Sequence, residues 1–361
     1  MCLGFHTPAP LREVTMVTFK FLTQHASARF GPVLVLVTFA IFIIGAGASP
    51  ELKTQTLSQQ IESIRVKFPG EMAVYMKNLV TGEELALDAD RVYETYSVIK
   101  IPIMVEVLRR AELGDFSLND RLEFKNSDKR LGSGLLSKMD PGLQPTIRDV
   151  LTLMIIVSDN TATDILADKV GRADVTKTMH DLGLKNTSIE FSVLDDYRQW
   201  FAYMDPHKHP QTADEIFRFP MDEYSEARVD EASRKLDNDS HIYFGHSTAR
   251  EVGWLLEKMV HGTLVSKVSS ALMLDILKKQ QVNDRFPRYL RNIPIAHKTG
   301  DDQPYIANDA GVLWVQNKPI VLVVFTAHHR GTTSALHDAI ARVAAYTVRH
   351  FGGDLSPDFQ P

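Results

Sequence analysis

The sequence predicts an α+β fold in which one antiparallel sheet, flanked by helices, is built from both chain ends around an inserted all-helical subdomain. Apolar runs with strand character lie near the start, at residues 72–76 and 83–87, and near the end, at 295–298, 310–315 and 320–325. Between these two groups, apolar residues recur at the three- and four-residue spacing of helices. Strands far apart in the chain must therefore pair across the inserted helices.

Size and composition fit a single catalytic domain, which we place at residues 49–355. The chain has 361 residues, of which 44% are hydrophobic, so it can bury a sizeable core. Its net charge is −5, and basic residues are neither in excess nor interleaved with aromatic ones, which argues against a nucleic-acid partner. The only cysteine, Cys2, lies too early for a disulfide in the mature protein. We expect a monomer that acts on a small molecule without metal or organic cofactor.

The first 48 residues have the order of a secretory signal peptide, which would occupy about residues 16–48. Lys20 and Arg29 precede the apolar run 32–44, and small residues follow up to an Ala-x-Ala site that predicts cleavage after Ala48. The alternative is an uncleaved membrane anchor, because the apolar stretch is just long enough to span a bilayer. Both interpretations place the rest of the chain outside the cytoplasm, in the periplasm or the extracellular space.

In the first half of the chain, the patterns predict a helix, a hairpin and then four more helices. An amphipathic pattern over 51–67 precedes the hairpin, whose turn is Thr81-Gly82. A helix that begins at Ser97 ends near Gly114, and turn-rich residues 115–145 open a helical subdomain over about 115–250. Its first three helices are expected to begin at Thr146, Thr161 and Ala173 and to end at Ser158-Asp159-Asn160, Val170 and Leu182.

Residues 195–245 break this pattern, and we interpret them as a long, partly ordered insertion and a candidate lid. They contain several prolines, many aromatic residues and few periodic apolar ones. His207 and His209 lie within the insertion, but no third residue has the spacing of a metal ligand. A pair of surface histidines is therefore favoured over a metal site.

The last part of the chain returns to clear patterns. Ser247 or Thr248 would cap a helix, with Glu251 behind it in a capping signature. A second helix is expected over 266–280, ahead of the three strands near the end. Further expectations are a turn at Asn317-Lys318 between the last two strands and a closing helix from Thr333 to Phe351.

The first stretch with chemical character runs from Tyr96 to Met104, where Ser97 precedes Lys100 by three residues. Three residues are nearly one helical turn, so both side chains lie on one face of the predicted helix. A serine nucleophile needs a group that takes its proton and donors for the charge that develops, and an amine at a helix start offers both. Alone the pattern means little, because a Ser three residues before a Lys occurs roughly once by chance in a chain of this size.

Two further triplets give the pattern weight. Ser158-Asp159-Asn160 lies at a predicted helix end, and Lys298-Thr299-Gly300 ends an apolar strand. Each has an ordinary structural explanation: Asn160 as a helix cap and Thr299-Gly300 as a turn. Each triplet should occur by chance in only roughly 5–10% of chains of this length, so all three in this order favour a functional site.

This set resembles the motifs of the serine β-lactamases and penicillin-binding proteins, and among them the class A β-lactamase-like branch. The resemblance covers about residues 52–350 and implies a β-lactamase/transpeptidase-like fold. Further similar stretches are 132–136, 280–287 and Asn308-Asp309.

The resemblance implies a catalytic role for four side chains. Ser97 would attack a carbonyl carbon and become acylated. Lys100, with a pKa lowered by burial, would take or relay the proton. Ser158 would pass a proton to the departing nitrogen, and Lys298 would polarise that serine.

Four more residues would bind the substrate if the resemblance holds. Asn160 would hydrogen-bond a substrate amide, and Thr299, with Lys298, would face a substrate carboxylate. The backbone N–H groups of Ser97 and Asp301 would form the oxyanion hole. Gly300 would let the substrate approach the strand edge closely.

The chain departs from the class A pattern at two points. Class A enzymes carry a Glu-x-x-Leu-Asn motif whose glutamate activates the deacylating water, and residues 190–200 lack it. The acids available there are Glu190, Asp195 and Asp196. The second departure is Asp301, where the family usually has a small or hydroxyl residue; an acid there would weaken selection for a substrate carboxylate.

Three functions remain open on the sequence. The first is a serine hydrolase of the class A type, acylated at Ser97, that hydrolyses β-lactam or similar cyclic or peptide amide bonds. The second is a peptidase or esterase that acts on the D-Ala peptides of the cell wall. The third is a penicillin-binding sensor that is acylated without turnover.

Overall fold

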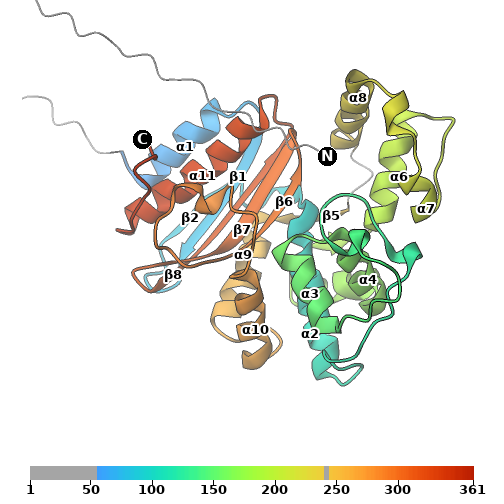
Figure 1. Ribbon diagram of the computed structural model, residues 1–361. Coiled ribbons are helices and arrows are strands. Elements are labelled where there is room, and N and C mark those ends of the chain that lie inside the picture. Colours follow the sequence, from blue (N-terminus) through green and yellow to red (C-terminus); the bar gives the residue numbers. More distant parts are fainter. Residues whose placement is uncertain (1–54, 240–243) are drawn as a thin grey trace, which may run out of the picture. The chain divides into compact units, whose positions relative to one another are not determined.

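A five-stranded antiparallel sheet joins the two ends of the chain, as the sequence predicted (Figure 1). The computed structural model describes residues 55–239 and 244–361. The strand order is β2-β1-β8-β7-β6, so that β1 from the start of the chain pairs with β8 from its end. The strands are β1 (Glu71–Asn78), β2 (Glu84–Leu87), β6 (Ile295–Asp302), β7 (Ile306–Val315) and β8 (Lys318–Ala327).

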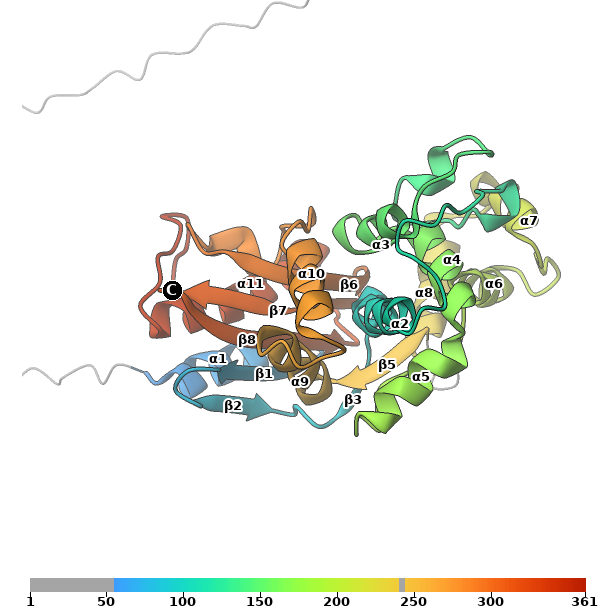
Figure 2. The same cartoon turned by 90° about the horizontal axis from the view of Figure 1, so that it is seen from below.

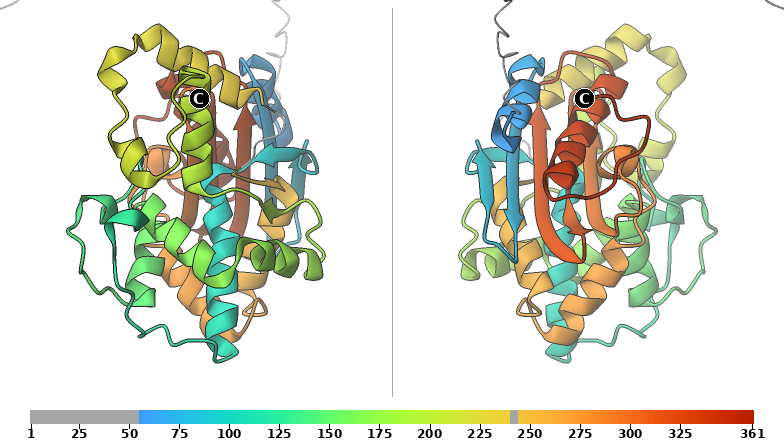
Figure 3. Two further views of the ribbon diagram at one scale, coloured as in Figure 1. Left: turned by 90° about the vertical axis from the view of Figure 1, so that its right-hand side faces the viewer. Right: turned by 90° about the vertical axis from the view of Figure 1, so that its left-hand side faces the viewer.

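Both faces of the central strands are buried, because successive side chains point into two different hydrophobic clusters. In β1, Met72, Val74 and Met76 join α1 (Leu57–Lys67) and α11 (Thr333–His350) in one cluster. The intervening Ala73 and Tyr75 face the other cluster, which contains α9 (Ala249–Val260). The right-hand view of Figure 3 shows α1 and α11 lying across the sheet.

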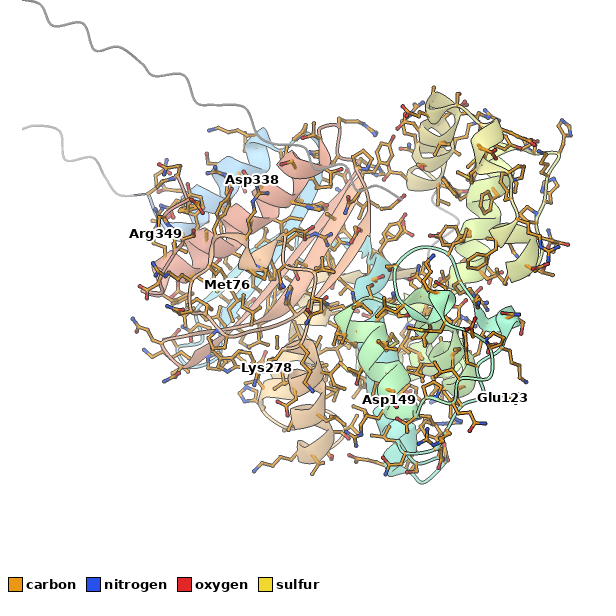
Figure 4. The ribbon with its side chains drawn as sticks, viewed as in Figure 1. Met76, Glu123, Asp149, Lys278, Asp338 and Arg349 are labelled. Carbon is orange, nitrogen blue, oxygen red and sulfur yellow. The ribbon has the colours of Figure 1, made fainter. Side chains whose placement is uncertain are left out.

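The helical part of the chain is built around α2 (Lys100–Glu112), whose residues from Lys100 to Leu108 are all buried. Figure 2 shows α2 between two parts of the molecule: the sheet with α9 and α10 (Lys267–Leu277) on one side, and the helices within residues 147–237 on the other. In Figure 4, Met76 marks the sheet-bearing half, whereas the exposed Glu123 and Asp149 mark the helical half. The helices around α2 are α3 (Ile147–Ile156), α4 (Asn160–Val170), α5 (Arg172–Asp181) and α10 (Lys267–Leu277).

A second, three-stranded sheet escaped the sequence analysis. It consists of β3 (Val92–Glu94), β5 (Gly245–Thr248) and β4 (Ser188–Ile189), in that order. Strands of two to four residues are too short for an alternating pattern to register. The last residue of β5, Thr248, caps α9 by accepting a hydrogen bond from the backbone N–H of Glu251, as expected.

The expectation of a partly ordered insertion over 195–245 was wrong for residues 195–239. This part of the chain contributes three helices, which face the viewer in the left-hand view of Figure 3. They pack around their own small core of Phe201, Met204, Ile216, Phe219 and Ala232. The helices are α6 (Val193–Met204), α7 (Ala213–Phe217) and α8 (Glu226–Asp237). His207 and His209 are both exposed on this segment.

Two local expectations need smaller corrections. The turn between β7 and β8 is formed by Gln316 and Asn317, both with positive φ, and Lys318 already pairs with Val315. Ser97 lies in a 3-10 turn, Tyr96–Ile99, that runs into α2, so the α-helix itself begins at Lys100.

The proposed signal peptide or anchor lies outside the described residues. None of the helices within the described ranges combines the length and apolarity needed to cross a bilayer.

Candidate active site

Ser97 sits where the 3-10 turn Tyr96–Ile99 is pressed against the edge strand β6. Tyr96, just before it, has a positive φ of 44°, a conformation that side chains with a Cβ rarely adopt and that tends to occur at functional sites. A Cβ on Gly300 would lie 2.4 Å from the carbonyl oxygen of Thr95 and 2.9 Å from the backbone nitrogen of Ser97. Glycine at this position therefore lets β6 pack directly against the backbone of the turn, whereas we had expected it to make room for substrate.

Two buried lysines converge on one hydroxyl group. The Nζ atoms of Lys100, from α2, and Lys298, from β6, each lie 3.0 Å from Oγ of Ser158. Lys100 also donates to the carbonyl oxygen of Ser158, at 2.7 Å, and to Oδ1 of Asn160, at 2.9 Å. Both lysines are fully buried. Residues from all three motifs, Lys100, Ser158 and Lys298, thus meet in one place.

This burial changes the protonation of the lysines. Desolvation lowers the pKa of Lys100 to about 7, although Asp159 and Asp164 oppose the shift. Desolvation, together with the neighbouring Lys100, lowers the pKa of Lys298 well below its ordinary value. Two ammonium groups this close cannot easily coexist without water, so amines that can accept a proton are present near neutral pH.

The Ser158-Asp159-Asn160 triplet is fixed by the loop around Gly132. Asp159 caps α4 through the backbone N–H of Ala162, and its other carboxylate oxygen accepts from the N–H groups of Leu135 and Leu136. A Cβ on Gly134 would lie 2.4 Å from the Asp159 carboxyl carbon. The middle residue of the triplet is therefore structural. It holds Ser158, whose φ is 55°, and Asn160 in place.

Asp301 is not a free acid beside Lys298, because it pairs with an arginine that the sequence analysis did not single out. Arg285 is fully buried and donates to Oδ2 of Asp301 at 2.8 Å and to the carbonyl oxygen of Asn308 at 2.9 Å. Burial would raise the pKa of Asp301, but the guanidinium group outweighs it and keeps the pKa below its usual value. Arg285 lies in the stretch 280–287, whose similarity to the family was the available signal.

A cavity of about 640 Å³ opens in front of these groups. One side, which we call the motif wall, consists of Ser97, Ser158, Asn160, Thr299 and Asp301. The other side, which we call the helix wall, comes from α6 and α8 and consists of Asp196, Tyr197, Trp200, Val229 and Leu236. The volume of the cavity suits a small molecule. Among the described residues, no group of three or more His, Cys, Asp or Glu side chains is placed to hold a metal ion.

The three acids considered for deacylation have different surroundings. Glu190 is half exposed, 3.9 Å from Nδ1 of His246, and does not line the cavity. Asp195 caps α6 through Ser192 and pairs with Arg198 at 2.7 Å. Only Asp196 lines the cavity with Ser97.

Asp302 also lines the cavity, and the sequence did not point to it because it follows the last motif without a pattern of its own. It lies at the end of β6, where the hydroxyl group of Tyr96 donates to its Oδ2 at 3.2 Å. Burial, together with Asp237 and Asp301, raises the pKa of Asp302 to about 7. The cavity therefore contains carboxyl groups from both β6 and α6.

The fold and the motif arrangement define a member of the serine β-lactamase and penicillin-binding protein superfamily. The chain belongs to the beta-lactamase enzyme family, whose model matches residues 56–351.

Two related sequences illustrate the distance to known members. The chain is 21% identical to the β-lactamase VEB-1 of Pseudomonas aeruginosa over 329 residues, which cover 88% of this chain and 96% of that protein. It is 29% identical to the β-lactamase regulatory protein BlaB of Streptomyces cacaoi, but over 121 residues only, which are 33% of this chain and 39% of that protein.

Solved structures show the same fold. A β-lactamase from Sphaerobacter thermophilus superimposes with a TM-score of 0.66 at 23% identity, covering 82% of this chain and 97% of that one. A single-residue mutant of PBP-A, solved as an acyl-enzyme complex with penicillin G, gives a TM-score of 0.64 at 24% identity, covering 82% and 96%.

Proposed function

We propose that the protein is a serine hydrolase of the class A β-lactamase type that is acylated at Ser97 and hydrolyses a β-lactam or a similar cyclic or peptide amide. One observation carries the proposal. Lys100 and Lys298 both lie 3.0 Å from Oγ of Ser158, behind a cavity that Ser97 lines. Acylation of a serine needs a proton acceptor and a proton donor near one carbonyl group, and this network holds both.

In the acylation step, Oγ of Ser97 adds to the carbonyl carbon of the amide and its proton passes to the neutral amine of Lys100. The backbone N–H groups of Ser97 and Asp301 stabilise the oxyanion. The C–N bond then breaks, and the leaving nitrogen takes a proton from Oγ of Ser158. Lys298 or Lys100 then returns a proton to that oxygen. Water hydrolyses the ester and restores Ser97.

The fold relation supports the first half of this reaction. The PBP-A mutant was captured as an acyl-enzyme with penicillin G, and we infer that the present cavity takes the same class of reagent. We also propose that the protein works outside the cytoplasm, on the basis of the signal-like residues 16–48.

Labelling with a fluorescent penicillin tests the proposal. The purified protein should become covalently labelled, and Ser97→Ala, checked for folding by circular dichroism, should not. Ser117→Ala is a matched control on an exposed turn and should label like the wild type. Labelling that survives Ser97→Ala would show that the site is wrong.

A second candidate is a peptidase or esterase that acts on an acyl substrate without a carboxylate beside the scissile bond. It is favoured by the Arg285–Asp301 ion pair, which engages the guanidinium group of Arg285, so that this group is not free to bind a substrate carboxylate beside Thr299. Hydrolysis of an uncharged acyl ester at a higher kcat/KM than penicillin hydrolysis would establish this candidate.

A further inference from the structure

We propose that Asp196 is the general base that activates the water for deacylation of Ser97. The inference rests on the proposed function, because it requires an acyl group on Ser97. Asp196 takes the role of the glutamate in the Glu-x-x-Leu-Asn motif, which this chain lacks, and it lies on the first turn of α6.

The position of Asp196 is fixed by Asp164, a buried residue of α4. The Asp164 carboxylate accepts hydrogen bonds from the backbone N–H groups of Val193 and Leu194, at 3.0 and 3.3 Å, at the start of α6. It is itself held by Arg130 and Arg172, at 2.5 and 3.1 Å. Because α4 begins at Asn160, the first turn of α6 has a set position relative to the motif wall.

The same turn lies beside the catalytic network. A Cβ built on Gly132 would lie 2.5 Å from the hydroxyl oxygen of Tyr197 and 2.6 Å from Nδ2 of Asn160, so these two atoms are close neighbours. Oδ1 of the same Asn160 accepts from Lys100. Asp196, which precedes Tyr197, lines the same cavity as Ser97 and therefore borders the space in which water would meet an ester on Ser97.

The other carboxylates have partners or positions that exclude them. Both oxygens of Asp195 are occupied, one by Ser192 and one by Arg198. Of the acids on the motif side of the cavity, Asp302 accepts from the hydroxyl group of Tyr96 through Oδ2, Asp301 pairs with Arg285, and Asp284 pairs with His337. Within residues 55–239 and 244–361, no hydrogen bond contributes to the pKa shift of the Asp196 carboxyl group, so its oxygens are available to a water molecule.

The electrostatics of the cavity suit a base at neutral pH. Burial, and then the negative charges of Asp302, Asp164 and Asp195, raise the pKa of Asp196 to about 7. A carboxylate with such a pKa is a stronger base than an ordinary one and is about half ionised at pH 7 and mostly ionised at pH 8. The titratable groups that surround it are Glu94 of β3, Tyr96 of the 3-10 turn, Asp164 of α4, Asp195 and Tyr197 of α6, and Asp302 of β6.

In the step itself, the oxygen of a water molecule adds to the ester carbonyl carbon while one of its protons passes to the Asp196 carboxylate. The bond between that carbon and Oγ of Ser97 then breaks. Its electron pair stays on Oγ, which takes the proton back from Asp196 directly or through Lys100. The products are the free acid and the original serine.

The test is the lifetime of the penicillin adduct, followed by intact mass after a single mixing step. Asp196→Asn should form the adduct at a rate within a few-fold of wild type and should lose it about 100-fold or more slowly, the usual size of a general-base contribution. The matched control is Glu190→Gln, a carboxyl outside the cavity that was also a candidate base, which should lose the adduct at a rate near wild type. Asp196→Glu should restore part of the rate.

A pH profile supplies a readout that loss of structure would not mimic. The wild-type deacylation rate should rise with pH, reach half its maximum near pH 7 and level off above about pH 8, because the carboxylate must be ionised. Asp196→Asn should lose this rise. The inference would be overturned if Asp196→Asn lost the adduct as fast as the wild type, if Glu190→Gln were slowed as much as Asp196→Asn, or if the wild-type adduct were permanent. A wild-type protein that forms no adduct would overturn the proposed function and this inference with it.

Discussion

The two walls of the cavity are built in different ways. The motif wall is held by hydrogen bonds between side chains. Oγ of Ser158 lies within hydrogen-bond distance of both Lys100 and Lys298, and Oδ1 of Asn160 accepts from Lys100. The helix wall depends on one buried carboxylate, Asp164, that ties α6 to α4. The first arrangement is written in short motifs, whereas the second exists only after folding. Acylation and deacylation should therefore respond to different mutations.

The largest expected effect is on the rate of acylation, which depends on Lys100 behind the motif wall. Lys100→Ala removes the proton acceptor of acylation and should lower the rate of adduct formation by about 10²–10⁴-fold. Stopped-flow fluorescence with a labelled penicillin measures that rate. A loss below tenfold would show that Lys100 is not the base of acylation.

The second effect is on the stability of the fold, which depends on Asp164 at the helix wall. Asp164→Asn leaves Arg130 and Arg172 without their buried partner, and we expect the free energy of unfolding to fall by about 3 kcal/mol. Urea denaturation measures the loss. Asp181→Asn is the control, because it breaks an exposed pair with Lys177 and should leave the stability unchanged. Equal stability of both variants would mean that Asp164 does not hold the helix wall.

The pH dependence of acylation follows from Lys100. Its pKa of about 7 lies below that of an exposed lysine, and only the neutral amine accepts a proton, so the rate should fall about tenfold per pH unit below 7. Above pH 8 it should be constant. Adduct formation measured by quenched mixing between pH 5 and 9 gives this profile, and a flat profile would contradict it.

The smallest effect concerns substrate preference. Asp301→Ser puts the residue type usual in the family beside Arg285 and removes the 2.8 Å ion pair. The released guanidinium group should lower the KM for penicillin several-fold. Steady-state hydrolysis compares the two proteins, and an unchanged KM would indicate that Arg285 does not reach the substrate carboxylate.

The motif wall could be predicted because its chemistry dictates residue types at short spacing. Ser97 and Lys100 are one helical turn apart, and Lys298 and Thr299 are neighbours on a strand. What the sequence could not show is how these pieces are joined. The contact of Gly300 with the Ser97 turn, and the pairing of Arg285 with Asp301, join segments that lie far apart or follow no periodic pattern.

The helix wall was harder to predict for a related reason. Its core residues Phe201 and Ala232 come from α6 and α8, whereas Phe219 lies outside the helices, in the stretch that contains the prolines, so the apolar residues of this core do not follow one helical period. Asp196 was one of three equal candidates until the structure showed that Asp195 is a helix cap and that Glu190 lies outside the cavity. Tertiary packing, not local pattern, selects among them.

The most direct measurement of the central claim is a single-turnover mass time course of the wild-type protein with a penicillin. We expect the protein to gain the mass of the intact penicillin on a peptide that contains Ser97, and the original mass to return as the ring-opened product appears. A protein whose mass never changes, or that carries the adduct on another residue, would contradict this claim.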